Sequence, residues 1–448
     1  MQLTDFFKNA QSYPLKEQLI RGGVGSVILK IIGTFLSLAS AVVLARLLGV
    51  EDYGLYVYIL AVITILSIPA QAGIKTLVTR ETARSHAIRD WSLMRGIWRW
   101  AVIAVGVMAL VIAVTSGLVA WIWSGDFEDK KLATFAWGVA LIPVLSLCAL
   151  RAAALRGLRR VLLSQLPEPV IIPAALVILV SLYAWVAQPS EVTSSHAMIS
   201  HLLSAALAYI VGTWLLLKSR PQEVFLRSGP CVYKTREWIH AIGPLALISG
   251  MQVVNKYTGL IVLGIFQDAG DVGIYRVVLY GGTLAVFGLQ ALSIVVAPYI
   301  ARLYTEGNIE KLQLVATYTA RGSLVMSLPV AFVFIFWGGD VLAFAFGEEF
   351  RAGHAAIGIV ALGQLVNASV GSVVYVLNMT GFERDAAKGV GVAAICSLIL
   401  NILLIPYFGL IGAAIAQTAT LCIWNVLLWF YARSRVGISS DIIGRLPG

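Results

Sequence analysis

The sequence predicts an all-α integral membrane protein with about twelve transmembrane helices, arranged as two pseudo-symmetric lobes of six. Of its 448 residues, 59% are hydrophobic and only 12% are charged, whereas soluble domains carry about 25% charged residues. Apolar runs of about 20 residues, the length that crosses a bilayer as a helix, recur along the whole chain. Two of these runs, one in each half of the chain, also carry the same polar pattern.

Twelve apolar runs account for most of the chain. They cover residues 22–48, 53–72, 100–123, 132–150, 161–187, 200–217, 239–266, 272–298, 322–346, 355–379, 390–406 and 410–431. A polar, basic segment that includes Pro221 and Pro230 separates the sixth run from the seventh. We therefore expect an N-terminal lobe at residues 1–217, a cytoplasmic linker at 218–236 and a C-terminal lobe at 237–448.

The lysines and arginines predict which side of the membrane each loop faces. Of 33 such residues, 26 lie in the two terminal segments and in alternate loops. The opposite loops hold only Lys130, Lys131 and Arg351, among many acidic residues. Loops rich in Lys and Arg stay in the cytoplasm. We therefore predict a multi-pass protein of the cytoplasmic (inner) membrane, with both termini in the cytoplasm.

Several function classes lack the motifs that they need. No G-x-x-x-x-G-K-[ST] sequence occurs, so the chain has no P-loop for ATP. The cysteines and histidines show no metal-ligand spacing, and the short external loops carry no catalytic motif. The basic residues are scattered and form no single patch for nucleic acid. We expect no enzymatic activity, cofactor, metal or nucleic-acid partner, and a function carried out within the membrane.

Two apolar runs each carry a lysine within a matching polar triplet. The triplets are Ser26, Lys30 and Gly33 in the first run and Gln252, Lys256 and Gly259 in the seventh. The spacing i, i+4 and i+7 places each triplet on one helical face. A charged side chain inside the membrane costs several kcal/mol and usually faces a water-filled interior or a partner. We predict that Lys30 and Lys256 face a lumen and bind an anion.

The two lysines differ in their surroundings. Lys256 lies deeper in its run, and Gln252 and Asn255 beside it are further candidate contacts for the anion. Lys30 lies only about two turns from the start of its run. A long basic side chain so close to the end of a span can instead extend to the cytoplasmic interface, which is the alternative for Lys30.

Two arginines extend the predicted basic interior toward the outside. Arg46 and Arg276 lie near the outer ends of spans one and eight. Together with the two lysines they would make a cavity positive from its midplane to its outer mouth. The alternative is that both arginines anchor their helices at the interface, beside external acidic residues.

Glu168 is the candidate for binding a coupling ion, a proton or Na⁺. It lies in Leu166–Pro173, LPEPVIIP, whose three prolines should kink or break the fifth span. A broken helix at membrane depth is a recurring ion site in transporters. The alternative is an interfacial carboxylate paired with one of the arginines just before it, Arg156, Arg159 or Arg160.

Three stretches and one shorter element resemble a known family. They are Leu44–Tyr56 (LARLLGVEDYGLY) with its counterpart Leu263–Tyr275 (LGIFQDAGDVGIY), Ala149–Pro169 (ALRAAALRGLRRVLLSQLPEP), Val376–Gln417 (including TGFERD and NILLIPYFGLIGAAIAQ) and Phe346–Phe350 (FGEEF). By their order and spacing, over roughly residues 20–430, the chain resembles the Wzx-like flippases. These form the polysaccharide transporter branch of the multidrug/oligosaccharidyl-lipid/polysaccharide (MOP) exporter superfamily.

The resemblance implies a V-shaped fold in which spans one, two, seven and eight line a central cavity. It also implies the substrate, a polyprenyl-pyrophosphate-linked oligosaccharide that moves from the inner to the outer leaflet for O-antigen, capsule or exopolysaccharide synthesis. Lys30 and Lys256 would fill the positions of that family's basic lumen residues. Membrane lipid, a polysaccharide polymerase and chain-length machinery are the other expected partners. Rocking of the lobes, driven by an ion gradient or the membrane potential, would expose the cavity to each side in turn.

Two other functions are compatible with a polytopic protein of this length. A multidrug exporter of the same superfamily takes organic cations, and its cavity would favour carboxylates over lysines. A membrane polymerase or glycosyltransferase acting on the same lipid-linked sugar needs catalytic groups, usually on a sizeable external loop. The longest external loop predicted here, residues 188–199, has about twelve residues.

Overall fold

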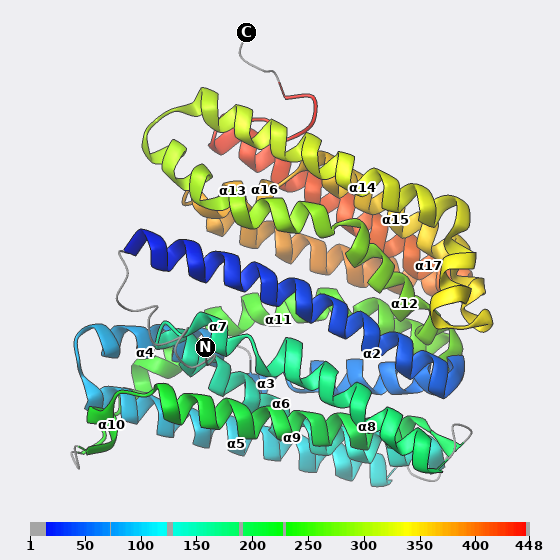
Figure 1. Ribbon diagram of the computed structural model, residues 1–448, viewed down its shortest axis with the longest axis horizontal. Helices are drawn as coiled ribbons and strands as arrows, with labels where there is room; N and C mark the ends of the chain where they lie inside the picture. Colours follow the sequence, from blue (N-terminus) through cyan, green and yellow to red (C-terminus); the bar gives the residue numbers. More distant parts are fainter. Residues whose placement is uncertain (1–14, 72, 123–128, 188–190, 227–229, 445–448) are drawn as a thin grey trace, which may run out of the picture.

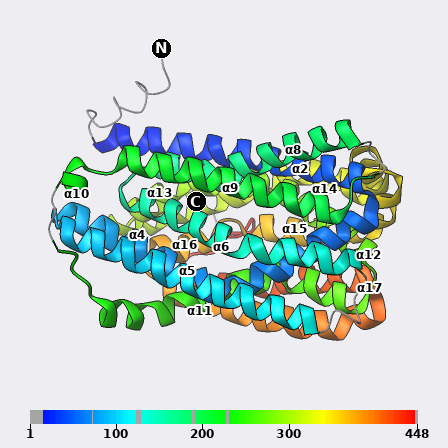
Figure 2. The same ribbon diagram turned by 90° about the horizontal axis from the view of Figure 1, so that it is seen from below.

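The computed structural model describes residues 15–71, 73–122, 129–187, 191–226 and 230–444, and all regular structure in these ranges is helical. The elements are α2 (Leu15–Leu66), α3 (Ile68–Gln71), α4 (Ile74–Ala87), α5 (Trp91–Ile122), α6 (Asp129–Gly157), α7 (Val161–Ser164), the π-helical turn η3 (Pro167–Ile171), α8 (Ile172–Ala187), α9 (Ser194–Ser219), α10 (Gln222–Leu226), α11 (Thr235–Phe266), α12 (Ala269–Ala285), α13 (Phe287–Thr305), α14 (Ile309–Phe346), the 3₁₀ turn η5 (Glu348–Gly353), α15 (His354–Val370), α16 (Val373–Met379) and α17 (Glu383–Arg435). The long helices run side by side (Figures 1 and 2). The predicted all-α membrane fold class is confirmed.

Ten helical segments in the described residues are long and apolar enough to cross a membrane. Two of the helices, α2 with 52 residues and α17 with 53, are each interrupted by a glycine with non-helical backbone angles. Gly49 has φ 73° and Gly409 has φ 50°, values that glycine adopts without the steric cost of a side chain. A straight helix of this length would measure about 78 Å, well over twice the thickness of the hydrocarbon core. Each of these two helices therefore consists of two arms, in agreement with the two predicted spans that it contains. The total of twelve spans stays a prediction.

Two predicted spans are each divided between two helices. Residues 272–298 fall on α12 and α13, which meet at Val286, and residues 355–379 fall on α15 and α16. Gly371, between α15 and α16, has φ 75° and lies against Ser440 and Ala320, so that a side chain there would collide with both. Hydropathy does not reveal these breaks, because the residues on both sides of each are apolar.

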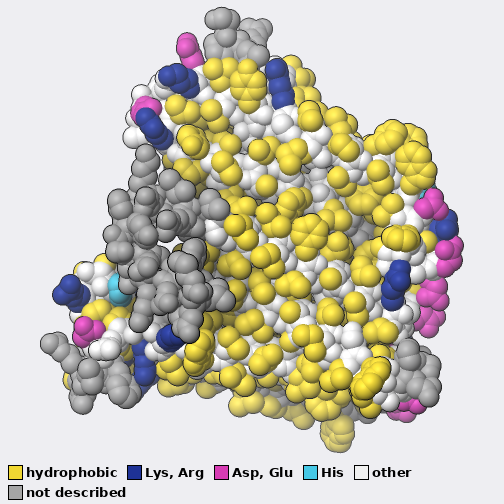
Figure 3. Space-filling model, in the orientation of Figure 1, with side chains coloured by type: hydrophobic (Ala, Val, Ile, Leu, Met, Phe, Trp, Pro, Cys, Tyr) yellow, Lys and Arg dark blue, Asp and Glu magenta, His cyan; other side chains and the backbone are white. Residues whose placement is uncertain are grey.

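The outer surface matches a bilayer environment. In Figure 3 the visible face is mostly hydrophobic, and charged side chains gather mainly near the two ends of the helices. Large apolar side chains are exposed on several long helices; Trp185 of α8, Phe344 of α14 and Tyr407 of α17 are each more than 80% exposed. In water such a surface would aggregate, whereas in lipid it costs nothing. The hydrophobic runs therefore serve both the core and the lipid contact.

The two halves of the chain meet along α2. In Figure 1, α13 to α17 lie on one side of its first arm and α4 to α10 on the other. Its second arm packs directly on α12, where Gly54 and Gly273 allow the backbones to touch. A Cβ at Gly54 would lie 1.7 Å from the carbonyl oxygen of Ala269, and one at Gly273 would lie 2.7 Å from that of Val50. These residues belong to the two stretches that the sequence predicts to be counterparts.

The end of the bundle that contains this crossing is called the acidic end. Its turns carry Glu51, Asp52, Asp268, Asp271, Glu348 and Glu349. Two polar contacts tie the halves together there. Arg46 donates from Nε to the carbonyl oxygen of Ala345 at 2.9 Å and from Nη2 to that of Phe344, which satisfies the last carbonyls of α14. Glu349 accepts a hydrogen bond from the backbone N–H of Val50 at 3.0 Å. The acidic end is thus closed in this structure.

Loss of these contacts should favour opening at the acidic end. In the double variant Arg46→Ala/Glu349→Gln, we expect a cysteine at Ser37, on the interior cavity described below, to react about tenfold faster with a membrane-impermeant maleimide from that side. Arg46→Ala removes two hydrogen bonds from a charged donor, and Glu349→Gln removes the charge from the third acceptor. A hydrogen bond with a charged partner contributes about 1.5–3 kcal/mol before solvent screening. The measurement uses a background in which the four native cysteines are serine. Arg302→Ala, which removes an ion pair within the α13 region, is the control. An unchanged labelling rate in the double variant would contradict the assignment.

Candidate functional site

A cavity of about 160 Å³ lies between the two halves of the chain. Ser37 and Ser40 from the first arm of α2, and Tyr53 and Tyr56 from the second arm, form part of its wall. η3, α8, α9 and α12 supply the rest, including the predicted residues Glu168 and Arg276, which come from opposite halves of the chain. Spans one, two and eight line this cavity as expected, together with spans five and six, whereas span seven, which was also expected there, contributes no lining residue among those described. Two predicted site residues that lie 108 positions apart in the sequence are brought to one cavity.

Arg276 is a cation without a carboxylate partner among the described residues. Its Nη2 donates to the hydroxyl of Tyr280 at 3.3 Å, and the guanidinium lies 4.8 Å from the centre of that ring. Tyr257, Tyr53 and Tyr56 also lie within electrostatic range of Arg276. A guanidinium has five N–H donors, and neutral tyrosines leave its charge uncompensated. The site can therefore accept an anion.

Glu168 owes its position to the proline-rich turn. Pro167 and Pro169 flank it in η3, where the N–H of Ile171 bonds to the carbonyl of Leu166, a wider turn than an α-helix makes. The predicted break in span five is therefore present, as a π-helical turn. Glu168 is exposed to the cavity and lies within electrostatic range of Lys75. None of its predicted arginine partners forms an ion pair with it among the described residues.

The glycines of the two triplets occupy equivalent packing positions. A Cβ at Gly33 would meet Pro169 at 2.8 Å, and Ser26 accepts a hydrogen bond from Gln165 at 3.4 Å. In the second half, a Cβ at Gly259 would meet Tyr275 and Asn401. Span one therefore packs on the fifth span as span seven packs on the eleventh, which supports the predicted match between the halves.

The two lysines of the triplets do not line the 160 Å³ cavity. Both are exposed, and Lys256 Nζ lies 5.3 Å from the ring centre of Tyr257. Tyr257 is also within electrostatic range of Arg276 and Lys75. Lys75, Lys256 and Arg276 are thus linked through one tyrosine, whereas no described contact links Lys30 to them. Lumen roles for both lysines stay predictions.

The remaining predicted residues are spread out. Gln252 is exposed and Asn255 is half-buried one turn along α11 from Gln252. Arg46 lies at the acidic end, where it binds the end of α14. Its guanidinium is engaged there in this closed arrangement, so a role in binding substrate stays a prediction.

Sequence reasoning missed polar residues in and near the cavity. His201 of α9 is buried and its Nδ1 lies 2.6 Å from the hydroxyl of Tyr56. Lys75 of α4 is within electrostatic range of Glu168. The available signal for His201 was a lone histidine in an apolar run. The direction in which its side chain points depends on the rotation of the helix, which the sequence does not give. In the described residues no cluster of His, Cys, Asp and Glu could hold a metal.

Comparison with known proteins places the fold. An inward-facing multidrug transporter of the MATE family and MOP superfamily matches with TM-score 0.71 at 14% identity, covering 92% of this chain and 98% of that one. The lipid II flippase MurJ, in an inward closed conformation, matches with TM-score 0.69 at 13% identity, covering 92% and 87%. At this identity the likeness concerns the fold alone. It confirms that the fold is of the type found in MOP superfamily transporters.

Comparison of the sequences leads to the family. A curated relative from Haloferax volcanii, described as the probable low-salt glycan biosynthesis flippase Agl15, is 23% identical over 425 residues, which cover 94% of this chain and 84% of the relative. A protein-family match described as "Polysaccharide biosynthesis protein" extends over residues 43–353, well over half of the chain. This range includes the acidic-end crossing and every residue that lines the cavity beyond Ser37, Ser40 and Ala41. The chain belongs to the polysaccharide biosynthesis protein family.

Proposed function

We propose that this protein is a flippase, not an enzyme. It moves polyprenyl-pyrophosphate-linked oligosaccharide repeat units from the inner to the outer leaflet of the cytoplasmic membrane by alternating access. The observation that carries the proposal is Arg276, a cation that lines a cavity between the two halves and forms no ion pair with any carboxylate in the described part of the chain. Membership of a polysaccharide biosynthesis family and a relative described as a glycan flippase support it.

The chemistry of the site fits the headgroup. A pyrophosphate carries about two to three negative charges and cannot cross hydrocarbon unaided. Arg276 offers bidentate, charge-assisted hydrogen bonds to a phosphate, and the tyrosines around it donate to further oxygens. Lys256 and Lys75 continue the positive charge along Tyr257. The cavity of 160 Å³ is too small for a sugar-bearing headgroup, so the halves must separate to admit it.

The proposed orientation places the acidic end outside and the basic loops in the cytoplasm. With the acidic end closed by Arg46 and Glu349, the structure corresponds to a state that is shut to the outside. Polymerase and chain-length proteins would act on the product after it reaches the outer leaflet.

A leaflet-resolved inventory of lipid-linked saccharide tests the function. In cells that lack this protein, we expect lipid-linked repeat units to accumulate on the inner leaflet and surface polymer to disappear. A probe that reaches only the outer face reports the side. Normal amounts on the outer face, left unpolymerised, would instead point to a polymerase. A normal lipid pool together with sensitivity to cationic drugs would point to an exporter.

Alanine variants test the cationic site. We expect Arg276→Ala to reduce transport about 10–100-fold, because one charge-assisted hydrogen-bonded partner contributes about 1.5–3 kcal/mol. Lys256→Ala should abolish transport without loss of protein from the membrane, Lys30→Ala should have a weaker effect, and Lys256→Arg should retain part of the activity. Arg302→Ala, at an exposed ion pair on α13, is the matched control. Normal transport by the Lys30→Ala/Lys256→Ala double variant would refute the basic lumen.

Glu168 is the proposed site of the coupling ion. Its carboxylate shares the cavity with Arg276 and faces Lys75, so a bound anion and a bound cation can influence each other across a short distance. Glu168→Gln keeps the size and removes the charge. We expect it to lose the dependence of transport on a proton or Na⁺ gradient in vesicles, while binding of a lipid-linked saccharide persists. Retention of gradient-driven transport in this variant would exclude the role.

A further inference from the structure

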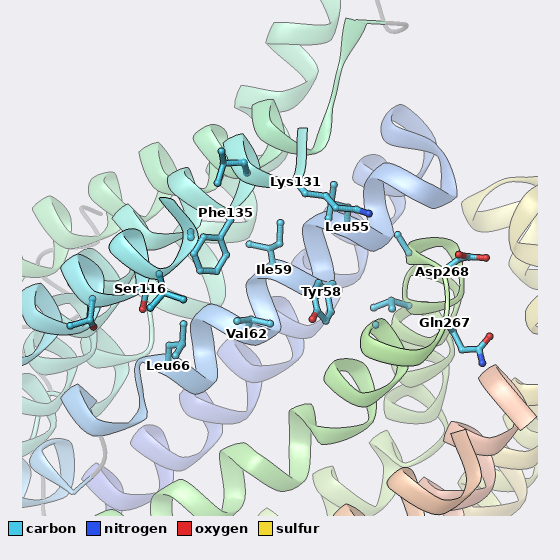
Figure 4. A pocket seen from close by; sticks show the side chains of 17 residues that line it. Leu55, Tyr58, Ile59, Val62, Leu66, Ser116, Lys131, Phe135, Gln267 and Asp268 are labelled. Atoms are coloured by element: carbon cyan, nitrogen blue, oxygen red, sulfur yellow. The ribbon is translucent and has the colours of Figure 1, made fainter. Parts of the chain in front are cut away.

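A second, larger cavity of about 840 Å³ lies apart from the cationic site (Figure 4). Its walls come from the second arm of α2, from α5 and α6, and from the junction of α11 with α12. Leu55, Ile59, Val62 and Leu66 form one apolar wall, and Phe135 faces it from α6. The lining is predominantly apolar, as a hydrocarbon ligand requires.

The depth of this groove matches one leaflet. From Leu55 to Leu66 the second arm of α2 rises about 16 Å, which is about half of the hydrocarbon core. Asp268 and Gln267 lie at the acidic end of the groove. Lys131 of α6 lines the side of the groove across from them (Figure 4). If the acidic end lies at the head-group level, a groove of this depth reaches the middle of the membrane.

One helix separates the groove from the cationic cavity. On the second arm of α2, Leu55, Tyr58 and Val62 line the groove, with the spacing of one helical face. Tyr53, Tyr56, Val57 and Leu60 of the same arm line the cavity that contains Arg276. The two spaces are thus back to back, on opposite faces of a single helix.

The groove also lies on the seam between the halves. Gly264 of α11 abuts the ring of Tyr58, and a Cβ at Gly264 would lie 2.2 Å from it. This contact closes the seam beside the groove. Separation of α11 from the second arm of α2 would join the groove to the interior at this position.

We propose that this groove holds the isoprenoid chain of the lipid-linked substrate in the leaflet at the acidic end. The inference rests on the proposed function. A covalent lipid whose pyrophosphate is in the interior and whose tail is in the bilayer must pass between the halves, so the tail emerges at an interlobe seam. A groove on such a seam, back to back with the cation site, places a single hydrocarbon chain beside its own headgroup.

Photoaffinity labelling of the full-length protein in nanodiscs tests the groove. The probe is a polyprenyl phosphate with a diazirine in its isoprenoid chain and no sugar, so labelling needs no transport. We expect labelled peptides from residues 55–66 of α2 and 115–120 of α5. Unlabelled polyprenyl phosphate should compete, whereas phosphatidylglycerol at the same concentration should not. Labelling elsewhere, or equal competition by phosphatidylglycerol, would overturn the inference.

Two neighbouring residues of α5 provide a matched pair of variants. Val119 lines the groove and is 58% exposed, whereas Leu118 is 52% exposed and does not line it. Val119→Trp should reduce labelling about tenfold by filling the groove, roughly the effect of losing two buried methylene groups, and Leu118→Trp should not. Ser116→Phe, also in the groove, serves if Val119→Trp does not elute as a single folded species. Equal labelling of groove-filling and control variants would refute the site.

These outcomes are separable from those of the proposed function. If inner-leaflet accumulation is absent in cells that lack the protein but the probe labels the groove, the flippase assignment fails and the isoprenoid site stands. If accumulation occurs and the probe labels other helices, the flippase assignment stands and the groove is excluded.

Discussion

The charge of Arg276 is the constraint on which the interior of this protein depends. A guanidinium within a membrane bundle is stable only with polar partners or water, and Tyr280, Tyr257 and Tyr53 supply dipoles without neutralising it. Among the described residues no carboxylate forms an ion pair with Arg276, and Glu168 lines the same cavity without pairing with it, so the guanidinium can accept an anion. The cavity, the placement of Glu168 in a π-helical turn, and the closure at the acidic end can each be understood as arrangements around this one charge.

Small residues bring the backbones of the two halves into contact within a buried apolar cluster that both halves share. Gly54 and Gly273 allow two backbones to touch at the acidic end, where Arg46 and Glu349 add hydrogen bonds to backbone groups at helix ends. Within a bilayer, lipid tails compete equally well for apolar side chains, so backbone packing and hydrogen bonds carry the association.

The second arm of α2 connects the two candidate binding spaces. One of its faces borders the cationic cavity and the other borders the apolar groove. An amphiphilic substrate presents the same combination, a charged headgroup and a hydrocarbon chain joined by a covalent bond. The helix that separates these environments also packs on α11 and α12 of the other half, through Gly264 and Gly273. Movement between the halves therefore acts on both spaces together.

The sequence alone determined the membrane class, the helical runs, the matching triplets around Lys30 and Lys256, and the break at Leu166–Pro173, because hydrophobicity, helical spacing and proline act locally. It also selected Arg276 and Glu168. Only the tertiary structure decided that these two share a cavity, that His201 and Lys75 lie near them, and that Arg46 is bound to the end of α14. The physical reason is helix rotation. An apolar run fixes that a helix spans the membrane, but nearly uniform hydrophobicity on all sides leaves the direction of each polar residue to packing between distant helices.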